Sequence, residues 1–180
     1  MSGIVFSNPV GSLPEAYIAE SRAQLAQSHG KIVHCLEQLD EDQLHWRPSE
    51  SMNSPANIVQ HLCGNLRQWA ICPITGEPDR RNRPAEFADR HLYSKGELLD
   101  RLSATVREAD EAMSRVTSAE QLVRPLRVQG FDVSLLIALY DTVSHFKGHS
   151  QEIVYITRML LGERYRFLFV PATKEQGAGG

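Results

Sequence analysis

The chain has 180 residues, of which 42% are hydrophobic, and this length favours one domain with one core over two. The formal charge of −3 provides no basic surface for a phosphate backbone, so nucleic-acid binding is disfavoured. No apolar run approaches the ~20 residues that a membrane span needs, and the N-terminus lacks the build of a signal peptide. We therefore expect a cytoplasmic protein without a membrane partner.

The cysteines predict neither disulfides nor a thiolate metal site. Cys35, Cys63 and Cys72 are odd in number and widely spaced, and no C-x-x-C pair is present. We expect reduced thiols.

Two helices are predicted in the first half of the chain. The first runs from about Pro14 to Leu39, because its apolar residues recur at the steps of three, four and seven that one buried helix face requires. The second runs from about Pro55 to Ile71, with Ser54 as its cap and Pro73 as its stop.

A proline-rich and arginine-rich segment, residues 73–93, separates these helices from the next one. It is too long for a tight turn and is interpreted as a non-helical crossover connection. A third helix is predicted from about Ser94 to Val116, followed by either a short hairpin or an extended connector over residues 117–132.

The fourth helix has the strongest periodicity in the chain. Apolar residues recur from Leu135 to Leu160 at alternating steps of four and three, and Gly162 ends the pattern. Four helices without a convincing sheet predict an all-α four-helix bundle. The expected domain covers residues 1–180, with a core at about 14–162 and flexible ends.

Three histidines form the candidate metal site. His145 and His149 are four residues apart, so their rings project from the same face of the fourth helix. His61 occupies the core side of the second helix, which could face the fourth. Three imidazoles leave open coordination positions and suit zinc, nickel or iron. Gly148, inside the fourth helix, indicates either close approach of a neighbour or a tolerated glycine.

The other histidines fit this site less well. The expected role of each is solvated or structural, and they are His29, His34, His45 and His91.

One histidine on the second predicted helix and H-x-x-x-H on the fourth resemble the pattern of the DinB-like superfamily. This superfamily includes DNA-damage-induced proteins, YfiT-like bacillithiol transferases and mycothiol-dependent maleylpyruvate isomerase. An uncharacterised subfamily of small bacterial DinB-like proteins is resembled more closely, through the segments NSPANIVQHLCGNLRQW, GEPDRRNRPAEF and HFKGHSQEIVYITRML. The resemblance implies a metal triad of His61, His145 and His149, an up-down-down-up order of helices, and homodimers.

One position departs from the pattern of the superfamily. Relatives often have Gln three residues after the last ligand, whereas this chain has Glu152. Its carboxylate could orient a ligand, act as a catalytic base or pair with Arg158.

The expected cofactor is one divalent metal ion, zinc or nickel first, with iron or manganese as alternatives. The resemblance implies an enzyme that transfers the sulfur of a low-molecular-weight thiol to a small-molecule substrate. A metal-dependent hydrolase using Glu152 and a non-catalytic stress-response binding module are the alternatives.

The residues around the histidines leave further choices open. Arg80, Arg81 and Arg83 could clamp the carboxylates of a thiol cofactor, or they could pair with acidic residues of their own loop, Glu86 and Asp89. Asn65 is expected as a hydrogen-bond partner of His61, whereas Arg67 is expected to support the loop.

Overall fold

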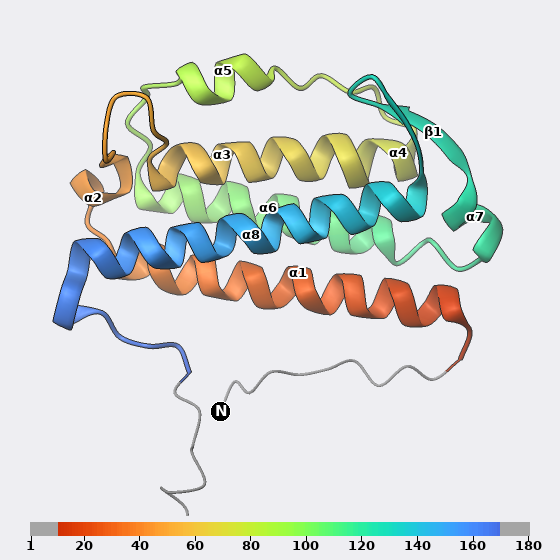
Figure 1. Ribbon diagram of the computed structural model, residues 1–180, viewed down its shortest axis with the longest axis horizontal. Coiled ribbons are helices and arrows are strands. Elements are labelled where there is room, and N and C mark those ends of the chain that lie inside the picture. Colours follow the sequence, from red (N-terminus) through yellow and green to blue (C-terminus); the bar gives the residue numbers. More distant parts are fainter. Residues whose placement is uncertain (1–10, 170–180) are drawn as a thin grey trace, which may run out of the picture.

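The computed structural model describes residues 11–169, and most of these residues are helical. Long helices lie side by side in Figure 1: α1 (Leu13–Gln38), α3 (Pro55–Leu66), α6 (Lys95–Met113) and α8 (Leu135–Leu161). The prediction of an all-α fold is confirmed at this level. No helix among the described residues is long and apolar enough to cross a membrane. The predicted ends of the chain lie partly outside the described residues.

The first helix begins where its capping residues place it. Ser12 is the N-cap, its backbone amide donates to Glu15 Oε2 at 2.8 Å, and Pro14 lies in the first turn. The buried face includes Ile18, Leu25 and Ile32. After α1, Asp40 caps the short helix α2 (Glu41–His45).

The second predicted helix does not stop at Pro73, so that expectation was wrong. The chain passes from α3 into the π-helical turn η1 (Arg67–Ile71) and then into α4 (Cys72–Thr75). In η1 the Cys72 amide donates to the carbonyl of Arg67, five residues back. The regular α-helical hydrogen bonds, from each amide to the carbonyl four residues back, are therefore already interrupted in η1. Pro73 has no amide hydrogen to donate, and it is tolerated because it lies in the first turn of α4. Helical structure ends at Gly76, where φ is 80°.

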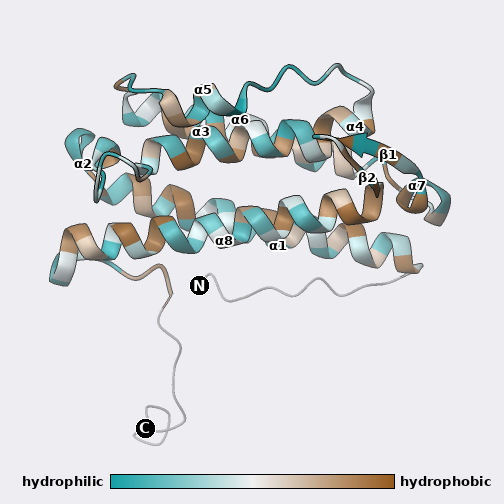
Figure 2. Cartoon of the chain, turned by 45° about the horizontal axis from the view of Figure 1, so that its top comes forward, coloured by the Kyte–Doolittle hydropathy of each residue, from teal (hydrophilic) through white to brown (hydrophobic). Residues whose placement is uncertain are grey.

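The crossover between α4 and α6 runs back along the bundle above α3 (Figure 1). Its first part, which leads from α4 to α5, is hydrophilic (Figure 2). The crossover was predicted to be non-helical, but it contains α5 (Arg83–Ala88), because Asn82 caps the amide of Ala85 and Pro84 lies in the first turn. The Asn57 side chain of α3 donates to the carbonyls of Glu86 and Asp89 at 3.0 and 3.2 Å, which fixes this segment on α3.

A hairpin connects the third and fourth long helices. Ser94 caps α6 through a capping box with Glu97. After the short helix α7 (Ala119–Val123), β1 (Pro125–Val128) pairs antiparallel with β2 (Phe131–Ser134). The residues between the strands, Gln129 and Gly130, have φ of 51° and 87°, as a tight two-residue turn requires. The hairpin is therefore the correct one of the two predicted alternatives.

The last long helix, α8, spans Leu135–Leu161 and ends at Gly162, as predicted; the 3-10 turn η2 (Gly162–Arg164) follows. Its buried face includes Leu139, Phe146 and Ile153, which pack in one core with side chains of α1, α3 and α6. Gly148 is exposed, and a Cβ added there would meet no atom within 4 Å. The close approach considered for this glycine is therefore not found.

Candidate metal centre

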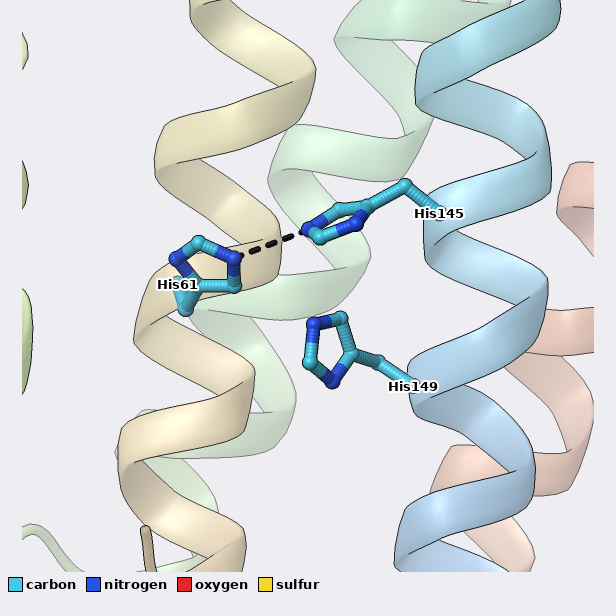
Figure 3. A group of neighbouring side chains, drawn as sticks. All are labelled: His61, His145 and His149. Atoms are coloured by element: carbon cyan, nitrogen blue, oxygen red, sulfur yellow. Dashed lines mark hydrogen bonds between the residues drawn. The ribbon is translucent and has the colours of Figure 1, made fainter.

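The three predicted histidines converge between α3 and α8 (Figure 3). His61 extends from α3, and His145 and His149 extend from successive turns of α8. One potential ligand atom from each residue lies within 4.8 Å of those from the other two. The Nε2 atoms of His61 and His145 are 2.8 Å apart. The predicted triad is thus a real cluster that could hold a metal ion.

Burial and neighbouring charges lower the pKa of one histidine of this cluster, His145. His61 is only 4% exposed, whereas His145 and His149 are half-buried. Burial, followed by the neighbouring charges of His149 and His61, lowers the pKa of His145 to about 4. The imidazole of His145 is therefore neutral at pH 7, which is the form that binds a metal.

The outer nitrogen of His61 contacts a buried ion pair from the crossover. Its Nδ1 lies 3.0 Å from Glu86 Oε2. Arg81 donates to the same carboxylate through Nε at 2.7 Å and Nη2 at 2.8 Å. Burial alone would raise the pKa of Glu86, but the hydrogen bonds from Arg81 and His61 outweigh it, so this pKa is lowered. Glu86 is therefore an ionised acceptor beside His61.

His149 also has a carboxylate partner, which comes from its own helix. Its Nδ1 lies 2.6 Å from Oε2 of Glu152, one turn further along α8. The hydrogen bond with His149 is the main reason that the pKa of Glu152 is lowered. Arg158, the alternative partner of Glu152, instead lies over the rings of Tyr165 and Phe167. Of the roles considered for Glu152, its contacts favour orienting His149.

This donor set fits a divalent metal ion. Nδ1 of His61 and Nδ1 of His149 both face carboxylates, so Nε2 is left for the centre of the cluster. Carboxylate–histidine pairs of this kind commonly support metal ligands. Nitrogens bound to one tetrahedral zinc ion are roughly 3.3 Å apart for bonds near 2.0–2.1 Å. The observed distances between the potential ligand nitrogens of the three histidines, from 2.8 Å to no more than 4.8 Å, bracket that value.

A pocket of about 490 Å³ leads to this centre. His61 and His145 lie on its wall, and Arg83 places a guanidinium at the pocket, 4.9 Å from the ring of Phe87. The other lining residues come from α3, η1, the crossover, the hairpin and the first turns of α8: Asn65, Trp69, Arg81, Gln129, Phe131, Asp132, Val133, Ile137 and Asp141. The pocket thus combines aromatic surface with charges of both signs next to two of the three histidines.

Residues 12–174 match the family model of DUF1572, proteins of unknown function. The chain belongs to the DUF1572 family. No curated protein matches it. Two solved structures share its fold: a conserved protein from Enterococcus faecalis (TM-score 0.66, 19% identity, covering 79% of this chain and 95% of that one) and a DinB-like protein, YjoA, from Bacillus subtilis (TM-score 0.62, 15% identity, 83% and 96%). The helical fold expected from the resemblance to DinB-like proteins is thus also found in a solved DinB-like structure.

The arginines of the crossover separate into two kinds in this DUF1572 protein. The side chain of Arg81 is 3% exposed and bound to Glu86, as the loop-pairing alternative predicted. Arg83 is exposed and lines the pocket without an ion pair to any described residue. Of the two predicted cofactor-binding residues, Arg83 is the one whose charge is available to a ligand.

Two residues near the triad make contacts other than those predicted. Asn65 was expected to bind His61, but this was wrong, because its Oδ1 accepts from Thr142 Oγ1 at 2.6 Å and so links α3 to α8. Arg67 does not support the loop either. It extends to α6 and pairs with Glu108.

The remaining histidines make structural contacts, as expected. His29, His34 and His45 hydrogen-bond Ser103, the carbonyl of Arg166 and the carbonyl of Tyr93, and the ring of His91 packs on that of Tyr93. None of them joins the triad among the described residues.

Sequence reasoning missed two carboxylates of the site. Asp141 lies one turn before His145 and lines the pocket, so Asp141, His145 and His149 follow one another at steps of four. That spacing was visible in the sequence. Glu86 had been considered only as a loop partner for arginine, and no local spacing connects it with His61, which is 25 residues away.

Proposed function

We propose that this protein binds one divalent metal ion through Nε2 of His61, His145 and His149 and is a metal-dependent enzyme. Zinc or nickel is the first expectation, because three imidazole ligands with open coordination positions suit these ions. The observation that carries the proposal is the convergence of three ligand atoms within 4.8 Å beside a pocket. A structural zinc site usually has four protein ligands, so a three-ligand site argues against a purely structural role.

The reaction that we propose is thiol-dependent S-transfer. A divalent ion at the triad would lower the pKa of a thiol and so supply a nucleophile at neutral pH. The thiol sulfur would form a bond to the electrophilic carbon of a second substrate, whose leaving group departs. Thiol-transferring members of the DinB-like superfamily support this choice of reaction.

The protein residues around the pocket would bind and orient the thiol. Arg83 is placed to bind a carboxylate of a low-molecular-weight thiol by a charge-assisted hydrogen bond. Trp69 and Phe131, with ring centroids 6.4 Å apart, provide apolar surface for the organic part of either substrate. Binding at these residues would hold the thiol next to His61 and His145.

A metal-dependent hydrolase is the second candidate. Glu152, the base predicted for it, is bonded to His149 and does not line the pocket described above. Asp141 does line it and is exposed. Hydrolysis would therefore use Asp141 more readily than Glu152 as the group that accepts a proton from water.

Metal content and a substrate panel test these proposals. Protein purified without a histidine tag or chelator is expected to contain about one metal ion per chain, which His61→Ala or His145→Ala removes. Bacillithiol, mycothiol and glutathione are then offered with electrophiles, and an ester and amide panel is run in parallel. Metal-dependent thiol loss that falls in Arg83→Met supports S-transfer. Ester or amide cleavage that falls in Asp141→Asn supports hydrolysis, and inertness in both panels contradicts an enzyme.

We also propose the finer features of architecture and assembly that the resemblance implies. The colour gradient of Figure 1 supports an up-down-down-up order, because α1 and α8 run one way and α3 and α6 the other. The proposed location is the cytoplasm. The proposed assembly is a homodimer, which is supported by exposed apolar side chains on α8 such as Tyr140 and Tyr155, 66% and 69% exposed. Light scattering with size-exclusion chromatography tests the dimer.

A further inference from the structure

Within residues 11–169, His61 is the only one of the three histidines whose outer nitrogen contacts groups from a distant part of the chain. Glu86 Oε2 and Arg81 Nη2 are each 3.0 Å from its Nδ1. Both groups come from the crossover, and the side chains of Arg81 and Glu86 are only 3% and 12% exposed. A buried ion pair therefore faces the metal ligand from the side opposite to the triad.

The far side of Arg81 is fixed as firmly as the side that faces His61. Its Nη1 donates to Gln68 Oε1 at 2.9 Å, and its backbone amide donates to Asp79 Oδ1 at 3.0 Å. Gln68 in turn donates to the other oxygen of Asp79 at 2.6 Å. Arg81 is thus bound between η1 and its own loop, so Glu86 receives its two hydrogen bonds from a donor that has little freedom to move.

Gly64 makes room for this pair on α3. A Cβ built on Gly64 would lie 2.0 Å from Glu86 Oε1 and 2.9 Å from Arg81 Nε, distances that the packed pair does not allow. A glycine inside a helix costs about 1 kcal/mol relative to alanine. Here the missing Cβ brings a carboxylate within hydrogen-bond distance of His61, one turn earlier on the same helix.

We propose that the Arg81–Glu86 pair, seated on Gly64, is a positioning element that keeps the ring proton of His61 on Nδ1 and leaves Nε2 directed at His145 and His149. The inference rests on the proposed metal site. Oε2 of Glu86 accepts an Nδ1–H from His61, whereas Nη2 of Arg81, a donor at the same 3.0 Å from Nδ1, already donates to that Oε2 at the shorter distance of 2.8 Å. The pair thus fixes both the tautomer and the ring orientation of His61, a role that differs from the cofactor clamp expected of Arg81.

The tautomer can be measured directly in metal-free full-length protein at pH 7. Nitrogen chemical shifts of histidine-labelled protein distinguish a protonated from an unprotonated ring nitrogen, and His61→Ala assigns the signals. The wild type is expected to show a protonated Nδ1 at His61. In Glu86→Gln the new amide can donate to Nδ1, so the proton should move to Nε2 and zinc affinity should fall by about 10- to 100-fold. Glu86→Asp keeps an acceptor and should restore the Nδ1 proton.

Matched variants separate this role from general effects on folding. Glu108→Gln removes the acidic partner of Arg67 in another ion pair and should leave the His61 signals unchanged. Gly64→Ala should displace the pair and alter these signals. Gly148→Ala, which adds the same Cβ in open space on α8, should not. Circular dichroism confirms that each variant is folded.

The two readouts decide different questions. If Glu86→Gln and Gly64→Ala both keep the Nδ1 proton of the wild type, the inference is overturned, even if zinc binds to the triad. If the tautomer changes as expected, the inference holds. The proposed metal site is decided separately, by competition of the wild type and His61→Ala with a chromophoric zinc chelator.

Discussion

The two sides of the candidate metal centre are built differently. On α3, His61 is buried and contacts an ion pair of the crossover, whose two members are 20 and 25 residues further along the chain. On α8, His145 and His149 are half-buried, and the only carboxylate that holds either through a hydrogen bond among the described residues is Glu152, one turn from His149. One side is fixed by tertiary structure and the other by helical spacing. The first should therefore resist perturbation, and the second should adjust to ligands.

The largest expected effect is that of breaking the buried pair. Arg81→Met leaves Glu86 without its cation, and loss of one partner of a buried pair costs about 3–5 kcal/mol. At about 2–4 °C per kcal/mol for a chain of this size, the melting temperature should fall by roughly 10 °C.

The matched control is the surface pair Arg22–Asp110, which has the same two-point geometry but side chains 39% and 38% exposed. Arg22→Met should cost no more than about 1 kcal/mol. Equal losses of melting temperature in the two variants would show that the crossover pair is not effectively buried.

The next effect distinguishes the ligands themselves. His61→Ala and His149→Ala should each weaken zinc binding by about 100-fold or more, since a zinc site worth roughly 10–16 kcal/mol is shared among a few ligands. Only His61→Ala should also destabilise the metal-free protein, by about 1–3 kcal/mol, because it removes a partner of buried Glu86. Chelator competition and urea unfolding measure the two quantities, and similar metal-free stabilities would contradict the contrast between the two sides.

A smaller effect is expected where α3 and α8 are linked without a histidine. Thr142→Val removes the buried donor to Asn65, which costs about 1–2 kcal/mol. Neither residue hydrogen-bonds the triad, so zinc affinity should stay within about threefold of the wild type, less than 1 kcal/mol. A loss as large as that of His61→Ala would mean that the bond between the helices itself sets the geometry of the site.

The smallest effect concerns pH. Hydrogen bonds from Arg22 lower the pKa of Asp110 below 3.8. The pair therefore stabilises the fold fully above that value, and its contribution is lost as pH falls through the lower folded-state pKa. Urea midpoints of the wild type and Arg22→Met should differ slightly at pH 5 and converge towards pH 3. If the difference between the two urea midpoints instead grew as the pH falls, the predicted direction of the pH dependence would be contradicted.

Much of the fold was accessible from the sequence because its signals are local. The periodicity of α8, the Ser54–Pro55 start of α3 and the terminal Gly162 each depend on neighbours within a few residues. The π-helical turn and α5 were missed. Prolines were interpreted as breakers in both places, although each lies in the first turn of a short helix, where its missing N–H costs nothing.

The same distinction between local and long-range signals applies to the candidate site. The spacing of His145 and His149 and the inward position of His61 were sufficient to find the triad. The role of a glycine was not accessible, since it depends on what the rest of the chain places against it. Gly148 was singled out from the sequence and faces open space, whereas Gly64 lies against the carboxylate of Glu86 on α5, 22 residues later.

The π-helical turn η1 has the form of a one-residue insertion that a helix has absorbed. It supplies both Gln68, which holds Arg81, and Trp69, which lines the pocket. Removing one residue from such a turn would restore an ordinary helix and rotate the side chains beyond it by about 100°. A single codon gained or lost here would therefore change the wall of the pocket while leaving the histidines in place, a simple route by which related chains could diverge in substrate.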